Sequence, residues 1–189
     1  MKRLIALVLL FALALAQGLE AFWKAVEVPG GVCADGSPYR FYVSPGDPRK
    51  VVVDFQGGGA CWDQATCGPE SRTYRKRVDV QELYLAQGIY NRMSVANPFF
   101  GWTHVFVPYC TGDLHVGRAT VDYGGFKVHH QGARNAQAAL EYVFRNHTNP
   151  ERVFVTGCSA GAYGAAPWAD KLPAPHPNAP AAHPPPTTL

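Results

Sequence analysis

The chain has 189 residues, of which 47% are hydrophobic and 16% are charged, and its formal net charge is +3. This length is typical of one domain, and the apolar content excludes a wholly disordered protein. Two of the 17 basic residues, Lys2 and Arg3, lie in a segment that we expect to be removed, which leaves 15 basic against 14 acidic residues and argues against nucleic-acid binding through charge.

Residues 1–16 have the pattern of a secretory signal peptide. Lys2 and Arg3 precede an apolar run over residues 4–16 that ends in Ala14-Leu15-Ala16. The run has 13 residues, whereas a helix that spans a bilayer needs about 20. We therefore expect a secreted or periplasmic protein with no stable membrane insertion after signal cleavage; an uncleaved anchor is the alternative.

Alternating strand and helix patterns follow. Residues 22–43 contain short β-type runs, and residues 50–55 form a β-branched run typical of a buried strand. Residues 70–90 are mixed and charged, which indicates helix and loop, and residues 103–109 predict a second strand.

A helix is predicted over residues 132–146, where apolar side chains recur at helical spacing. Residues 152–156 form a third strand, and the Ala-rich segment from Ala160 should begin another helix. Strands that alternate with helices predict the α/β class with a mostly parallel sheet. In residues 173–189, seven of 17 residues are proline, which predicts a disordered or polyproline-like tail.

Five cysteines allow two disulfides and one free thiol in an oxidising compartment. Cys61 and Cys67 are close in sequence, so a local disulfide is plausible, while the remaining pairing stays open. No Cys-x-x-Cys motif or matching histidine pair supports a zinc site. We expect neither a metal nor a cofactor.

The sequence Gly157-Cys158-Ser159-Ala160-Gly161 fits the Gly-x-Ser-x-Gly pattern of a nucleophile elbow. A sharp strand-to-helix turn exposes the central serine, and it requires glycine two positions to either side because side chains there would collide. An ordinary Gly/Ser turn is the alternative. Cys158 is expected to point away from the site, into the core or a disulfide.

A second motif, Gly57-Gly58-Gly59, directly follows the strand over residues 50–55. Glycines at this place let main-chain N–H groups approach a substrate oxygen, as in an oxyanion hole. A phosphate-binding loop is disfavoured because no Gly-Lys-Ser/Thr or Gly-x-Gly-x-x-Gly follows. A plain glycine turn remains the alternative.

Three segments, residues 55–62, 108–113 and 157–161, resemble motifs of the pectin acetylesterase and Notum family and occur in its order. This resemblance implies a secreted serine carboxylesterase with an α/β-hydrolase fold over residues 17–172. It further implies that Ser159 is the nucleophile and that the N–H groups of Gly58, Gly59 and Ala160 form the oxyanion hole. Asp113 and His115 would lie near the pocket, or else serve only in loop hydrogen bonding.

The acid and the histidine of a catalytic triad are not evident. In this fold both follow the serine in the chain, and only Asp170, His176 and His183 do so here. The upstream histidines, His104, His129, His130 and His147, are out of order. We therefore expect a truncation or a reading-frame change near residue 168, and a domain without its last strands that is poorly stable alone or needs a partner.

The function expected from this reading is hydrolysis of acyl esters, with acetyl groups on carbohydrate as the favoured substrate. One alternative is a catalytically inactive secreted fragment or binding module built on the same half-fold. Another is a structural secreted protein whose elbow motif is coincidental.

Overall fold

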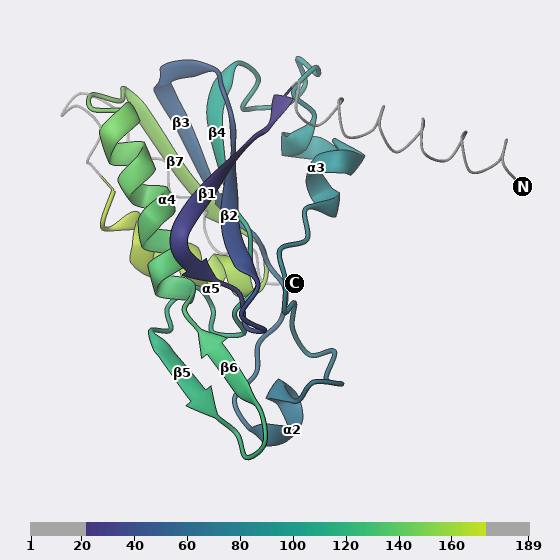
Figure 1. Ribbon diagram of the computed structural model, residues 1–189. Coiled ribbons are helices and arrows are strands. Elements are labelled where there is room, and N and C mark those ends of the chain that lie inside the picture. Colours follow the sequence, from purple (N-terminus) through teal and green to yellow (C-terminus); the bar gives the residue numbers. More distant parts are fainter. Residues whose placement is uncertain (1–21, 173–189) are drawn as a thin grey trace, which may run out of the picture.

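The computed structural model describes residues 22–172, so the expected signal peptide and Pro-rich tail lie outside the described residues. Five strands form the main sheet: β1 (Lys24–Val32), β2 (Pro38–Ser44), β3 (Asp47–Phe55), β4 (Trp102–Val107) and β7 (Arg152–Gly157). Their spatial order is β1-β2-β4-β3-β7 (Figure 1). The sheet is mixed, because β4, β3 and β7 are parallel whereas β1–β2 and β2–β4 are antiparallel.

The centre of the sheet is buried on both faces, as the unbroken apolar runs of β3 and β4 require. Val51, Val53 and Phe55 pack on one face against the apolar stripe of α4 (Gly132–Asn146), which includes Ala136 and Leu140. Helix α5 (Ala160–Ala169) follows β7 directly and joins the same core cluster.

The opposite face is covered by two short helices, α3 (Gln81–Leu85) and η1 (Gly88–Tyr90). Val80 and Leu83 pack there against Trp23, Tyr42 and Phe106. Figure 1 shows α4 and α3 on different sides of the sheet. The mixed helix and loop predicted for residues 70–90 is thereby confirmed.

A small second sheet extends from one end of the molecule. Strands β5 (Ala119–Asp122) and β6 (Lys127–His130) pair as an antiparallel hairpin next to α2 (Gln64–Cys67) (Figure 1). Two disulfides brace this end: Cys33–Cys110 joins the end of β1 to the segment after β4, and Cys61–Cys67 closes the turn of α2. The predicted local disulfide is thus confirmed. Among residues 22–172, no helix has the length and apolar character needed to cross a membrane.

Candidate active site

Ser159 occupies a strained turn between β7 and α5. Its backbone φ of 54° and ψ of −125° lie in a region that non-glycine residues rarely adopt. The side chain is exposed and makes no hydrogen bond to cap α5. The serine is therefore held outward at the N-terminus of a helix, where the helix dipole favours negative charge.

The flanking glycines are required by close main-chain contacts. A Cβ on Gly157 would lie 2.3 Å from the Gly161 carbonyl oxygen, and one on Gly161 would lie 1.9 Å from that of Phe55. Both distances are far below van der Waals contact. This is the tight strand-to-helix turn that the Gly-x-Ser-x-Gly motif predicts.

The glycine loop, defined as Gly57–Gly59, meets this elbow. The parallel register pairs Phe55 with Gly157, so both segments leave the sheet at the same edge. A Cβ on Gly57 would lie 3.2 Å from the Ser159 Cβ and 2.4 Å from the Cys158 carbonyl oxygen. Within residues 22–172, the main-chain N–H groups of Gly58 and Gly59 donate to no acceptor. The structure thus brings together two motifs that are about a hundred residues apart.

His115 contacts the main chain of the residue that precedes the glycine loop. Its ring is buried, and its Nε2–H donates to the Gln56 carbonyl oxygen at 2.9 Å. Burial lowers the pKa of this imidazole to about 4, so the ring is neutral near pH 7. The Trp168 indole donates to the His115 carbonyl at 2.9 Å and fixes its backbone. His115 is therefore engaged in holding the loops together and does not contact Ser159 through a hydrogen bond.

The Asp113 carboxylate accepts a hydrogen bond from the main chain at the start of α4. Its Oδ2 accepts the Gly132 N–H at 2.7 Å, and its Oδ1 accepts from the Thr111 hydroxyl at 2.6 Å and from the His115 N–H at 3.1 Å. A side chain on Gly132 would overlap this carboxylate. Asp113 and His115 both take part in loop hydrogen bonding, which is one of the two roles predicted for them.

The other histidines of the described region are engaged elsewhere. His104 is buried beside Asp54 at 3.5 Å, while His129, His130 and His147 hydrogen-bond to Thr120, Thr111 and Pro48, respectively. Asp170 caps the C-terminal end of α5. Within residues 22–172, no imidazole or carboxylate hydrogen-bonds to Ser159. His176 and His183 lie outside the described residues.

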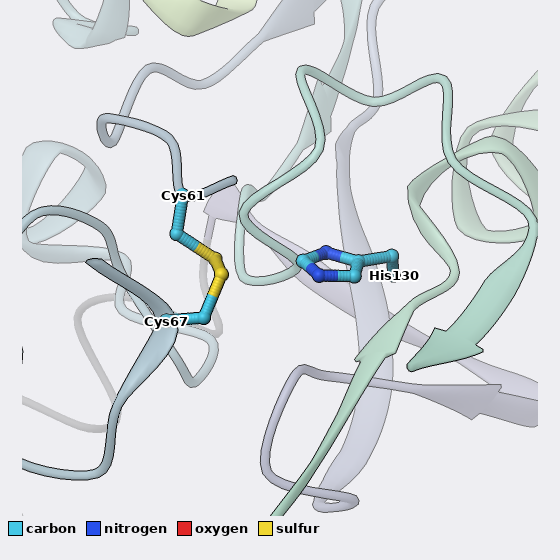
Figure 2. A group of neighbouring side chains, drawn as sticks. All are labelled: Cys61, Cys67 and His130. Atoms are coloured by element: carbon cyan, nitrogen blue, oxygen red, sulfur yellow. A yellow bond between two sulfur atoms is a disulfide. The ribbon is translucent and has the colours of Figure 1, made fainter. Parts of the chain in front are cut away.

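Figure 2 shows Cys61, Cys67 and His130 close together, with their ligand-type atoms within 4.8 Å of one another. The two sulfur atoms are bonded to each other, so neither is present as the thiolate that a metal would bind. The His130 Nδ1–H donates to the Thr111 carbonyl, and its Nε2 accepts from the Tyr123 hydroxyl at 3.0 Å. Both ring nitrogens are thus occupied, and the cluster braces the hairpin in this state.

Cys158 differs from its prediction. The sequence predicts a position in the core or in a disulfide, but Cys158 is an exposed free thiol. Cys158 directly follows β7, which is an edge strand of the main sheet within residues 22–172 and is itself only partly buried. Sequence reasoning also missed Gln56, Arg75 and Glu82, whose side chains join beside the glycine loop; no local motif marks such a long-range network.

The chain is similar in sequence to a family of known proteins. The family model described as Pectinacetylesterase matches residues 18–181. Pectin acetylesterase 11 of Arabidopsis thaliana is 28% identical over 150 residues, which cover 76% of this chain and 38% of that protein. Palmitoleoyl-protein carboxylesterase NOTUM of Schmidtea mediterranea is 27% identical over 150 residues, covering 74% of this chain and 28% of that protein.

A shorter relative and a solved structure also match. The inactive palmitoleoyl-protein carboxylesterase notum1b of Danio rerio is 29% identical over 109 residues, covering 54% of this chain and 76% of that protein. The structure of the Wnt deacylase Notum from Drosophila superposes with a TM-score of 0.59 at 21% identity, covering 76% of this chain and 45% of that chain. The fold is therefore α/β-hydrolase-like, and the chain spans well under half the length of its full-length curated relatives.

Proposed function

The chain belongs to the pectinacetylesterase family, and from this premise we propose that Ser159 is the nucleophile of a serine carboxylesterase-type hydrolase. The observation that carries the proposal is the strained backbone of Ser159, held against a glycine loop whose N–H groups are free to donate. Strain of this kind persists where the surrounding structure enforces it, and it clusters at active sites.

The proposed reaction has two steps. The Ser159 Oγ attacks the acyl carbonyl, the ester bond to the alcohol breaks, and the alcohol leaves with a proton. Water then cleaves the acyl-serine to release the acid and restore the hydroxyl. The N–H groups of Gly58, Gly59 and Ala160 stabilise the oxyanion of each tetrahedral intermediate, and each such donor contributes roughly 3 kcal/mol.

The attack requires a base that takes the serine proton. The described histidines are engaged elsewhere, as shown above, so the base in this proposal comes from outside residues 22–172 or from the solution. A suitable test supplies imidazole as an external base and follows covalent modification of the serine itself.

Acetyl esters of carbohydrates are the substrates that we propose, by analogy with the pectin acetylesterases among the relatives. Other relatives are named palmitoleoyl-protein carboxylesterases, so esters of a longer acyl chain should be compared with acetyl esters. A series of p-nitrophenyl esters from acetate to palmitate measures this preference directly. We further propose that the protein acts after export, in line with the pattern of residues 1–16 and two disulfides.

The test compares the unaltered chain with Ser159→Ala, and Ser94→Ala, in the loop between η1 and β4, serves as the matched control. We expect a fluorophosphonate to modify Ser159, as located by peptide mass spectrometry, and imidazole to accelerate the modification. We also expect p-nitrophenyl acetate hydrolysis to disappear in Ser159→Ala alone. An unmodified Ser159 with and without imidazole, or equal rates in the two variants, contradicts the proposal.

A second candidate is a catalytically inactive protein that binds acyl esters on the same half-site. It is favoured by the lack of a histidine at Ser159 within residues 22–172 and by a relative that is itself named inactive. Calorimetry with an acetylated oligosaccharide separates the candidates, because this one predicts binding without turnover, equal in the unaltered chain and Ser159→Ala.

A further inference from the structure

Two side chains, Gln56 and Arg75, reach the same two acceptors near α3. The Gln56 Nε2 donates to the Glu82 Oε2 at 2.8 Å and to the Asp79 carbonyl oxygen at 2.7 Å. Arg75 donates from Nη2 to the Glu82 Oε1 at 2.8 Å and from Nη1 to the Asp79 carbonyl at 3.2 Å. Each oxygen of the Glu82 carboxylate therefore holds one of the two donors, and the four groups close a ring.

The same two residues also adjoin the glycine loop. Gln56 directly precedes Gly57, and its Oε1 accepts the Tyr109 N–H at 2.9 Å. The Arg75 main-chain N–H donates to the Gly58 carbonyl at 2.9 Å, and a Cβ on Gly58 would lie 3.0 Å from the Arg75 Cγ and Cδ. The loop is thus held at its start by an amide and at its middle by an arginine.

The hydrogen-bonded ring of Gln56, Arg75, Glu82 and Asp79 is partly buried. The neighbours of Glu82 in this segment, Val80 and Leu83, are buried against the sheet. The side chains of Arg75 and Glu82 are 31% and 29% exposed, and Gln56 is buried. Hydrogen bonds to an ionised group in this partly desolvated setting are stronger than neutral ones, so Glu82 is the group that holds the two donors together.

We propose that Glu82 is a positioning residue for the oxyanion loop, because its carboxylate ties Gln56 to Arg75 and so fixes the N–H groups of Gly58 and Gly59 before a substrate arrives. The catalytic meaning of this role rests on the function proposed above. An oxyanion hole works because its donors need no reorganisation during the reaction, and a loop of three glycines has no side chains to supply that rigidity.

An exchange of amide and carboxylate tests the ring. Gln56→Glu places a second carboxylate oxygen against Glu82, and two carboxylates in contact repel unless they share a proton. Glu82→Gln alone leaves one of the two donors without an acceptor. The double variant Gln56→Glu/Glu82→Gln restores the donor–acceptor match between positions 56 and 82 and keeps an oxygen for Arg75. Its new carboxylate still faces the Asp79 carbonyl oxygen, as it does in Gln56→Glu, so the recovery is partial.

We expect kcat for ester hydrolysis to fall about 100-fold in Gln56→Glu with KM changed less than about threefold. The double variant should recover at least about a tenth of the original kcat. Relative to the unaltered protein at the same pH, Gln56→Glu should also regain activity as the pH falls from about 8 to about 5.5, because a shared proton re-forms the hydrogen bond. A merely structural role predicts neither the recovery in the double variant nor this pH profile.

Amide exchange measured by NMR gives a readout that does not need turnover. We expect exchange of the Arg75 N–H to accelerate about tenfold or more in Gln56→Glu, by less in Glu82→Gln, and to return toward its original rate in the double variant. Glu141→Gln is the matched control, since Glu141 pairs with Arg145 on the outer face of α4.

Unchanged Arg75 exchange in Gln56→Glu and Glu82→Gln, or no recovery in the double variant, overturns the positioning role. If exchange follows the expected order while no form of the protein reacts at Ser159, the esterase proposal fails and the loop-positioning role of Glu82 stands.

Discussion

The His115 imidazole donates its Nε2 hydrogen to the carbonyl oxygen of Gln56 at 2.9 Å. The ring is 1% exposed and packs against Phe55 and Tyr109. A neutral imidazole thus lies directly under the residue that begins the glycine loop. Gln56, the residue before the glycine loop, is therefore held at its main chain by His115 and at its side chain by Glu82.

Protonation of His115 should destabilise the fold in acid. Burial lowers the pKa of His115 from 6.5 to about 4, so between these values the unfolded chain binds a proton that the folded chain excludes. The stability due to this neutral ring is complete above pH 6.5 and is lost as the pH falls toward 4. The loss amounts to roughly 3 kcal/mol.

Urea unfolding at several pH values measures this effect against His115→Gln. The variant should be less stable than the unaltered protein at pH 7 but should lose less free energy of unfolding on acidification. Burial also lowers the pKa of His104, so part of the acid sensitivity should remain in the variant. Parallel pH profiles for the two proteins would refute the prediction.

Gly161→Ala should cost at least about 3 kcal/mol of stability, because the new Cβ overlaps main-chain atoms that cannot move aside. The clash is with the Phe55 carbonyl oxygen at 1.9 Å. Gly88→Ala is the control for backbone strain: Gly88 has a positive φ, of 55°, whereas Gly161 does not, and apart from its chain neighbours no atom lies within 4 Å of the Gly88 Cβ position. The control should lose only about 1–2 kcal/mol, and equal losses measured by thermal or urea unfolding would disprove the steric argument.

The two disulfides should contribute unequally to stability. Cys33–Cys110 spans 77 positions of the chain and Cys61–Cys67 spans 6. Loop-closure entropy gives about 4.5 kcal/mol for the longer loop and about 2.4 kcal/mol for the shorter one. Urea unfolding of Cys33→Ala/Cys110→Ala and of Cys61→Ala/Cys67→Ala checks this order, which a larger loss in the second pair would reverse.

Cys158 should be the thiol that reacts in the folded protein. It is exposed and free, whereas the other four cysteines are paired. Ellman's reagent should titrate about one thiol per chain without denaturant, and none in Cys158→Ser. Because Cys158 adjoins Ser159, the bulky adduct should also slow fluorophosphonate labelling; labelling at an undiminished rate would show that the two side chains diverge.

The local patterns predicted the parts of the fold that depend on nearby residues. The helix expected over residues 132–146 matches α4, and the strands expected around residues 50–55, 103–109 and 152–156 match β3, β4 and β7 within a few residues. These segments carry clear hydrophobic runs or periodicity. The elbow was also predictable, since only glycine fits beside such a turn.

Features set by distant contacts were not predictable. The antiparallel pairing of β2 with β4 and the partner of Cys33 depend on the topology of the sheet. The hairpin of β5 and β6 is short and largely polar, so it gives no alternating pattern. Glu82 is 26 positions from Gln56, and a single charged residue in a mixed segment gives no sign of its partner.

The left-handed backbone at position 159 has a consequence for laboratory evolution. Glycine adopts positive φ without steric penalty, whereas serine does not. A library screened for heat resistance alone should therefore enrich glycine at this position and discard the hydroxyl. Directed evolution for thermal stability must therefore be combined with a screen for esterase activity.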